Sequence, residues 1–357
     1  MLRPIITILA VILLFLLLVT GWDAFRSLSV WAARIGIGRW ERREEWKDAV
    51  RRRARKWLAH TPVVPKTDRR RYILLDILRG KYAAASIQSW QVAGLLMGLG
   101  KDDARSFADS HGHLFGNAPE VDEALLAYAL KKKGLLEDSQ EERILSLFQR
   151  YKDGGTVPYR QSLPDIRFVD TIGLACPLLY YDGLEAIADR QIAEYDRALL
   201  DGVFPPHAFS LDNGLPLGVY DWGRGVGWYI LGLVESGCNE GRIIGLARRM
   251  TGLQRTDGSF GCFLFNPAAS KESSATALAG ILFVRAYEIS GEKRFLEAAR
   301  KAEGALMGMT RRNGAVDYAQ GDTMGTGWYS SRFETMPFAQ GMTCYLSSLL
   351  DAVTVTE

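Results

Sequence analysis

Residues 222–228 read Trp222-Gly223-Arg224-Gly225-Val226-Gly227-Trp228. The run combines two large aromatic side chains and one permanently charged guanidinium with three glycines, which let the backbone bend freely. A tryptophan offers a flat apolar platform with one N–H donor, and Arg224 offers a planar array of donors that suits a carboxylate. An acidic sugar would use both features. The same run is also typical of a helix start in a packed core, because most aromatic side chains are buried.

Apolar residues recur at three- and four-residue spacing on both sides of this run, from Tyr72 to near the C-terminus. The spacing predicts helices, and no long alternation typical of strands occurs. An all-α domain of helical hairpins follows, and the periodicity alone fits either a closed barrel or a solenoid. The predicted helices cover residues 86–99, 102–110, 121–133, 140–151, 168–180, 184–199, 223–236, 240–254, 273–289, 292–307 and 335–352.

The composition is that of one large globular domain. The chain has 357 residues, of which 48% are hydrophobic, and this is enough material for a single core. The formal net charge is only +3, and the basic excess is concentrated between Arg26 and Arg71. Because the rest of the chain carries no basic patch, no nucleic-acid partner is expected.

Neither the cysteines nor the histidines predict a metal site. The four cysteines are far apart and form no CxxC pair, so we expect buried, reduced thiols, with a disulfide left open. His111 and His113 have no acidic or cysteine partner at ligand spacing, which favours a surface loop. The cysteines are Cys176, Cys238, Cys262 and Cys344.

An almost unbroken apolar run covers residues 5–19 and reaches about 18 residues if it extends to Trp22. This length is at the lower edge of a bilayer span. A cleaved secretory signal is the alternative, with Arg3 before the run and small residues at its end. We favour an uncleaved anchor over residues 1–22, because the run lacks an Ala-x-Ala end and because Trp22 and Trp31 lie where interfacial aromatic residues occur. The flanking basic residues slightly favour a cytoplasmic globular domain and leave the orientation open.

Residues 23–71 are expected to connect the anchor to the domain. Between residues 34 and 56, tryptophans alternate with clusters of arginine, lysine and glutamate. Two interpretations remain open: a basic helix resting on anionic headgroups, and a solvated helical linker stabilised by pairs of opposite charge. Pro62 and Pro65 discourage helix, so we place the globular domain at residues 72–357.

Two carboxylates interrupt apolar segments at predicted helix starts. Asp170 precedes Thr-Ile-Gly-Leu-Ala, and Asp122 precedes Glu123 and Ala-Leu-Leu-Ala-Tyr. Helix starts favour aspartate, so a purely structural cap is one interpretation, worth about 1 kcal/mol. The other is catalytic: two carboxylates brought together repel as anions, so one of them can hold a proton near neutral pH.

Several segments, in chain order, carry a family resemblance. They are Ser89-Trp90-Gln91, the six residues Val121-Asp122-Glu123-Ala124-Leu125-Leu126, Phe168-Val169-Asp170-Thr171 with residues 175–179, residues 222–228, and Glu272-Ser273-Ser274-Ala275-Thr276-Ala277. Together they resemble the unsaturated uronyl hydrolases of glycoside hydrolase families 88 and 105, especially the unsaturated rhamnogalacturonyl hydrolases. The resemblance covers about residues 72 to 353. It implies an (α/α)6 barrel, with the active site in its mouth.

The resemblance also implies a reaction. The substrate is an oligosaccharide whose terminal unsaturated uronic acid carries a C4=C5 double bond. The enzyme hydrates this bond, with Asp170 as general acid and base and Asp122 as the second active-site carboxylate. No metal or organic cofactor is implied. The other residues implied to bind substrate are Trp90, Arg160, His207, Trp222, Arg224 and Trp228.

Two other functional classes stay open. A different carbohydrate enzyme on the same barrel, such as a lyase, an epimerase or an inverting glycosidase, predicts another catalytic carboxylate, for which Asp221 and Glu272 are the candidates. A non-catalytic glycan-binding or scaffold subunit of a membrane polysaccharide assembly predicts that Asp170 is dispensable. In each case we expect a single-pass, membrane-anchored protein, in a bacterial inner membrane.

Overall fold

The structure is a computed structural model of the whole chain. It describes residues 2–60, 62, 64–65, 68–69, 71–79, 82–83, 89–110, 115, 119–237, 239–323 and 325–356. Three residues named above, His111, His113 and Cys238, lie outside this part, as do the first positions of the helix predicted at 86–99. Cys176, Cys262 and Cys344 are buried, free thiols.

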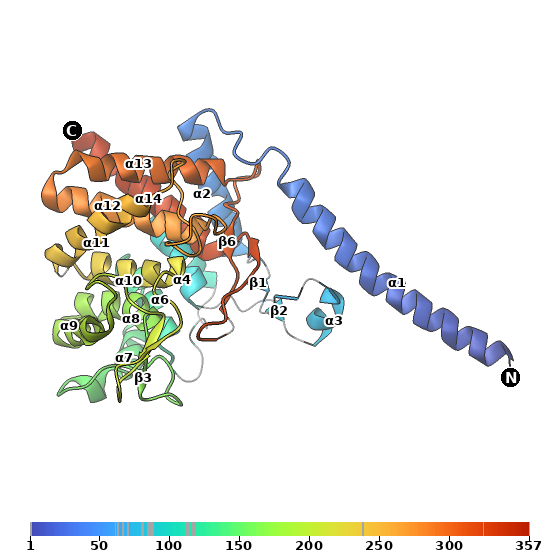
Figure 1. The fold of residues 1–357 in the computed structure, drawn as a ribbon, viewed down its shortest axis with the longest axis horizontal. Helices are drawn as coiled ribbons and strands as arrows, with labels where there is room; N and C mark the ends of the chain where they lie inside the picture. Colours follow the sequence, from blue (N-terminus) through green and yellow to red (C-terminus); the bar gives the residue numbers. More distant parts are fainter. Residues whose placement is uncertain are drawn as a thin grey trace.

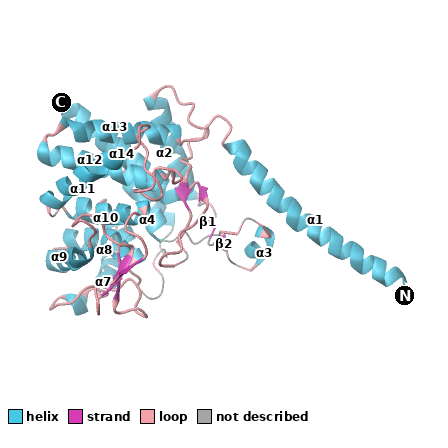
Figure 2. Cartoon of the chain, viewed as in Figure 1, coloured by secondary structure: helices cyan, strands magenta, loops and turns pink. Residues whose placement is uncertain are grey.

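Six helices form a closed inner ring. Figures 1 and 2 show that the domain is mostly helical. Each packs against two others, and the last closes the ring against the first. Glycines allow this closure, because a Cβ on Gly341 would lie 2.0 Å from the carbonyl oxygen of Gly94. The inner helices in ring order are α4 (Ser89–Gly98), α6 (Asp122–Lys131), α8 (Asp170–Tyr181), α10 (Gly223–Ser236), α12 (Ser273–Ser290) and α14 (Pro337–Thr356).

A second set of helices packs around the ring and returns the chain between successive inner helices. As a result the inner helices run in one direction and begin at the same end of the barrel. The (α/α)6 architecture implied by the sequence resemblance is the one observed. The outer helices are α2 (Arg43–Ala59), α5 (Lys101–Ser110), α7 (Asp138–Leu145), α9 (Glu185–Glu194), α11 (Glu240–Leu253) and α13 (Lys293–Gly308), with short 3-10 turns at Gln149–Tyr151 and Tyr195–Ala198.

Helix α2 lies within residues 23–71, which were predicted to form a linker, and packs against the barrel instead. It buries Trp46, Val50, Ala54 and Trp57, which are three or four residues apart, against α14 and α4. The many arginines and lysines on its other faces hid this apolar stripe in the sequence. The helical packing of the domain therefore includes α2 and begins well before residue 72, so α2 is not a free linker.

Short antiparallel strands join loops over one end of the barrel. Strand β3 (Ile166–Phe168) pairs with β4 (Ala208–Ser210), with Ile166 opposite Ser210, and β4 pairs with β5 (Pro216–Leu217). Strand β6 (Ala319–Gln320) pairs with β7 (Phe333–Glu334). A third pair joins β1 (Val64–Pro65) and β2 (Tyr82–Ala83).

The N-terminal helix α1 (Leu2–Ala33) projects from the barrel (Figure 1). Its residues Arg3–Ala33 are long and apolar enough to cross a membrane, and little of the helix is buried in the protein. An anchor and a signal sequence both meet this criterion. Where α1 meets the domain it packs against α3 (Ile73–Leu78). Just beyond its end, Arg34 donates two hydrogen bonds of 2.9 Å to the buried Asp317.

Candidate active site

The first turns of the inner helices gather polar and aromatic side chains around one cavity. Asp122 and Asp170 are the first residues of α6 and α8, while Trp90 and Arg224 are the second residues of α4 and α10. The cavity has a volume of about 400 Å³. Helix N-termini carry partial positive charge, so this end of the barrel favours an anionic ligand. The predicted residues that line the cavity are Trp90, Arg160, Asp170, His207, Trp222, Arg224 and Trp228.

Asp170 is the carboxylate that faces the cavity. Its side chain is 18% exposed, and its Oδ2 accepts no hydrogen bond from the described residues. Burial, aided by the nearby charge of Asp122, raises the pKa of Asp170 to about 7, although its own backbone N–H and Arg224 act in the opposite direction. Near neutral pH this group can therefore give up a proton and take one back.

Asp122 lies behind the cavity wall. Burial raises its pKa, while a hydrogen bond from the Tyr159 hydroxyl and the charge of Arg160 oppose the shift. Tyr159 lines the cavity, and the charges of both Asp122 and Asp170 act on it. Both carboxylates thus act on one tyrosine, which the sequence did not single out because Tyr159 comes from a loop.

We predict that Tyr159→Phe lowers the pKa of Asp170 and so moves the corresponding inflection in the pH profile of activity to lower pH. Without the hydroxyl the pKa of Asp122 rises, so Asp122 stays protonated to a higher pH and repels Asp170 less over that range. The pKa of Asp170 then falls below its present value of about 7. A pH titration of activity should show this shift together with a loss of about fivefold in rate, since one hydrogen bond is worth about 1 kcal/mol. An unchanged inflection would show that Tyr159 does not couple the carboxylates.

His207 is buried beside Asp170, with its Nε2 3.7 Å from Asp170 Oδ2. Burial, together with the charge of Arg224, lowers the pKa of His207 to about 4, so the ring is neutral at pH 7. Its Nδ1 lies 3.2 Å from the hydroxyl of Tyr329, which accepts a hydrogen bond from the Val219 N–H. The Tyr329 O–H can then donate its own hydrogen to Nδ1 of His207, which accepts it. We therefore assign the ring hydrogen of His207 to Nε2, facing Asp170.

Arg224 is 2% exposed and fixed on one side of its guanidinium. Its Nη1 donates to the carbonyl of Gln320 at 2.8 Å and contacts the sulfur of Met336, and its Nη2 donates to the carbonyl of Gly321. No described residue accepts a hydrogen bond from its Nε–H, and no described carboxylate forms an ion pair with it. The Nε and Nη2 edge can therefore still hold a bidentate carboxylate.

The three tryptophans shape the walls of the cavity. Trp222, Trp228 and Trp90 are only 2%, 3% and 7% exposed. Trp90 and Trp228 meet edge to face at 5.6 Å, and Trp222 lies 4.5 Å from the His207 ring. Their faces are largely covered by other rings, so in this structure they are not the open platforms that the sequence suggested.

Arg160 is the accessible cation of the cavity. Its side chain is 49% exposed, lies 3.9 Å from Glu120 and stacks over the Tyr159 ring at 4.5 Å. It can therefore reach a bound anion from the solvent side. The loop between β6 and β7 supplies wall residues that the sequence analysis missed, because nothing local indicates where this loop lies. They are Asp322, Thr323, Gly325 and Thr326.

The two alternative carboxylates have structural roles. Glu272 is fully buried and caps α12, where it accepts hydrogen bonds from Ala275 and Ser274 and from the backbone N–H of Gln320 at 3.0 Å. Asp221 accepts from the Phe265 backbone at 3.3 Å and does not line the cavity. Neither is placed to act as a second catalytic group there.

Solved structures described as glycoside hydrolases share this fold. A structure described as a possible member of glycoside hydrolase family 105, from Klebsiella pneumoniae, has a TM-score of 0.68 at 14% identity and covers 89% of this chain and 95% of its own. The unsaturated glucuronyl hydrolase of Bacillus sp. GL1, described as responsible for glycosaminoglycan degradation, has a TM-score of 0.59 at 17% identity, over 85% of this chain and 95% of its own. The chain has the family 88 and 105 fold.

This fold is not restricted to one chemistry. A polysaccharide lyase also matches, with a TM-score of 0.60 at 12% identity, over 88% of this chain and 98% of its own. No protein-family model and no curated protein matches the sequence. The fold alone therefore does not determine the reaction, which depends on the residues of the cavity.

Proposed function

We propose that this protein hydrates the C4=C5 double bond of unsaturated uronyl oligosaccharides. The observation that carries the proposal is a cavity-facing carboxyl group, Asp170, with a pKa raised to about 7 beside a buried arginine that has no carboxylate partner among the described residues. The family 88 and 105 fold supports the proposal, because the unsaturated glucuronyl hydrolase described above shares it.

The substrate enters with its carboxylate toward the free Nε and Nη2 edge of Arg224, and Arg160 adds charge from the solvent side. Asp170, in its protonated form, gives its proton to C4. Positive charge then develops at C5 and on the ring oxygen. A water molecule attacks C5 and passes its proton to the Asp170 carboxylate, which restores the acid.

The product of this step is a hemiketal at C5. It opens to a keto sugar and releases the neighbouring sugar, so one water molecule is consumed for each glycosidic bond lost. His207 stays neutral and can donate its Nε2 hydrogen to a substrate hydroxyl or to the attacking water. Burial, aided by the charge of Asp122, keeps the pKa of Asp170 high enough for it to hold a proton at neutral pH.

The activity is expected to fall as pH rises through about 7, the pKa of Asp170. Only the protonated carboxyl group can deliver a proton to C4, so kcat/KM should drop about tenfold for each pH unit above this value. His207, with a pKa of about 4, should add no inflection between pH 5 and 8. A pH profile of kcat/KM on an unsaturated disaccharide measures this, and a rate that rises through pH 7 would contradict an acid role for Asp170.

The proposal is tested directly by following the ultraviolet absorbance of the conjugated double bond. The full-length protein is incubated with a panel of unsaturated disaccharides generated by lyases, beside saturated counterparts as controls. Loss of absorbance is the expected result. Absence of any loss, together with binding of the same sugars, would instead favour the glycan-binding or scaffold function.

We also propose that α1 remains attached and anchors the protein as a single membrane-spanning helix. The support is its length and its apolar composition over Arg3–Ala33. The mass of the chain isolated from its host membrane distinguishes this anchor from a cleaved signal, because cleavage would remove most of the apolar run.

A further inference from the structure

The part of α1 closest to the barrel has an inverted polarity. The side that faces the protein carries two charged residues, Asp23 and Arg26, which are partly buried there together with Val30 and Ala33, and Arg34 follows directly after the helix. Asp23 accepts hydrogen bonds from the backbone N–H groups of Tyr72 at 2.5 Å and Ile73 at 2.9 Å. A helix on a soluble domain is expected to show the reverse arrangement, with its apolar side against the core.

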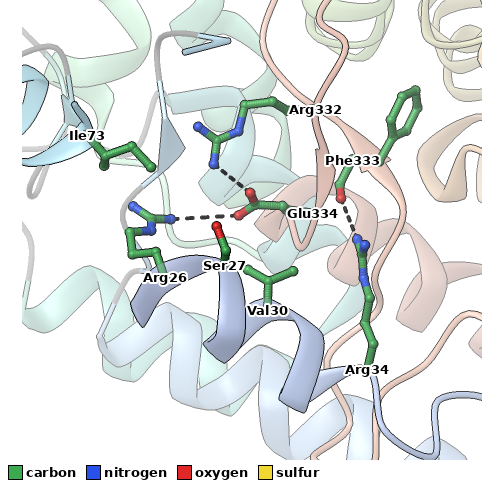
Figure 3. A pocket seen from close by; sticks show the side chains of 8 residues that line it. All are labelled: Arg26, Ser27, Val30, Arg34, Ile73, Arg332, Phe333 and Glu334. Atoms are coloured by element: carbon green, nitrogen blue, oxygen red, sulfur yellow. Dashed lines mark hydrogen bonds and ion pairs between the residues drawn. The ribbon is translucent and has the colours of Figure 1, made fainter. Parts of the chain in front are cut away.

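Strand β7 receives the other polar contacts of this side. Arg26 lies 3.8 Å from Glu334, and Arg34 donates to the carbonyl of Phe333 at 2.5 Å. Figure 3 shows these side chains around a polar cavity of about 200 Å³, which Val30 and Arg332 also line. The contacts fix which side of α1 faces the domain.

The opposite side of the same turns is apolar and uncovered. Trp22, Phe25, Leu28 and Trp31 are 40%, 62%, 62% and 66% exposed. They follow one another at intervals of three residues, and each step turns by about 60° around the helix. The band therefore winds over about half of the circumference, with Leu28 at the centre of the outward side. A continuous band of large apolar side chains on a protein surface indicates contact with a partner or a membrane.

The band follows the apolar run of α1 after Thr20 and Gly21. Residues 5–19 are apolar except for Thr7, and the protein first covers the helix at Val19, which is 1% exposed. From Trp22 onward, large exposed apolar side chains lie away from the side that contacts the domain. This change is expected where a helix leaves the hydrocarbon and the protein begins to cover one of its sides. Tyr72 and Leu78, at the two ends of α3, are exposed next to it.

The length of α1 agrees with this interpretation. The 31 residues of Arg3–Ala33 extend about 46 Å at ~1.5 Å per residue. A bilayer with its headgroup layers is about 40–45 Å thick, of which about 30 Å is hydrocarbon. The residues beyond Trp22 therefore reach through the interfacial layer, where tryptophan is enriched.

We infer that the outward side of α1 between Trp22 and Trp31 lies in the interfacial layer of a lipid bilayer, so that the barrel is seated directly on the membrane. The inference rests on the proposed anchor and adds to it, because an anchor alone would permit a barrel on a free tether. Contacts of Asp23, Arg26 and Arg34 with the domain exclude such a tether in the structure.

The test places an environment-sensitive fluorophore on single added cysteines of the full-length protein in phosphatidylcholine vesicles. Leu28→Cys reports on the outward band, Ser27→Cys on the adjacent side at nearly the same depth, and Leu13→Cys on the anchor. Ala186→Cys, exposed at the start of α9 at the other end of the barrel, is the aqueous control. The unmodified chain, labelled in parallel, gives the background from its own cysteines.

Nitroxide-bearing lipids are expected to quench the label at position 28 at least threefold more strongly than the label at 186, and more strongly than the label at 27. Iodide in the water should show the opposite order. Quenching by lipid at position 13 but not at 28 would overturn the seated barrel and leave the anchor intact. Lack of lipid quenching at both positions would overturn the anchor as well.

Discussion

Replacement of Asp170 by asparagine is expected to lower kcat on an unsaturated disaccharide by about 10²- to 10⁴-fold, the usual contribution of a positioned general acid and base. Asparagine keeps the shape of the side chain but cannot deliver a proton to C4 or accept one from water. KM should change little, because the Arg224 edge that receives the carboxylate is untouched. Initial rates from the ultraviolet assay give both constants.

The pH dependence of the stability of Asp170→Asn provides a control for its loss of activity. The folded pKa of Asp170 is about 7, whereas an unfolded aspartate titrates near ~3.9. The folded parent therefore binds more protons between these values, and the stability that comes from this group is present below pH ~4 and lost as pH rises through 7. Urea unfolding should show the variant gaining stability relative to the parent as pH rises over this window. An inactive variant without this gain would point to damaged folding rather than lost chemistry.

Arg224→Met is expected to lower the free energy of unfolding by about 3 kcal/mol or more. The methionine leaves the carbonyls of Gln320 and Gly321 without a donor inside the protein. Each buried acceptor left unpaired costs roughly 1–3 kcal/mol. Activity should also disappear, because the proposed carboxylate site is removed. Urea unfolding followed by circular dichroism measures the first effect.

An exposed arginine provides the comparison for this variant. Arg248 lies on α11 and pairs with Glu292 at 3.0 Å, with its side chain 56% exposed. Arg248→Met should change stability by less than about 0.5 kcal/mol, because exposed ion pairs contribute little. Equal losses for the two variants would mean that the contacts of Arg224 are not what holds the β6–β7 loop against the barrel.

Helix positions were predictable where a local signal marked both ends. Helix α10 occupies the predicted residues 223–236, since glycines open it and Gly237, at a φ of 64°, ends it. Helix α7 was predicted at 140–151 but ends at Leu145. Its start was misjudged because the capping box uses Glu137 as the N-cap, in place of the usual serine or threonine.

The residues of the candidate site also divide into those that a local sequence pattern marks and those that it does not. Asp122, Asp170 and Arg224 are at the starts of periodic segments, where a polar residue stands out from its neighbours. Tyr159 and Tyr329 come from loops, whose path depends on strand pairing between distant parts of the chain, and no local pattern encodes that path. Burial of Trp222 and Trp228 was one of the two interpretations of their run, and the choice between the two depends on which rings the fold brings together.

The closure of the inner ring bears on how the protein is made. Helix α14 supplies the last wall of the barrel, with Gly341 lying against Gly94 of the first. During synthesis the earlier inner helices leave the ribosome with an open seam of apolar side chains, which closes only when α14 emerges. If α1 has already entered the bilayer by then, the incomplete barrel is attached to the membrane while its apolar seam is still exposed to water. Neither protein nor lipid covers the seam at that stage. We expect nascent chains lacking α14 to be bound by chaperones, and release of that final helix to complete folding in a single late step.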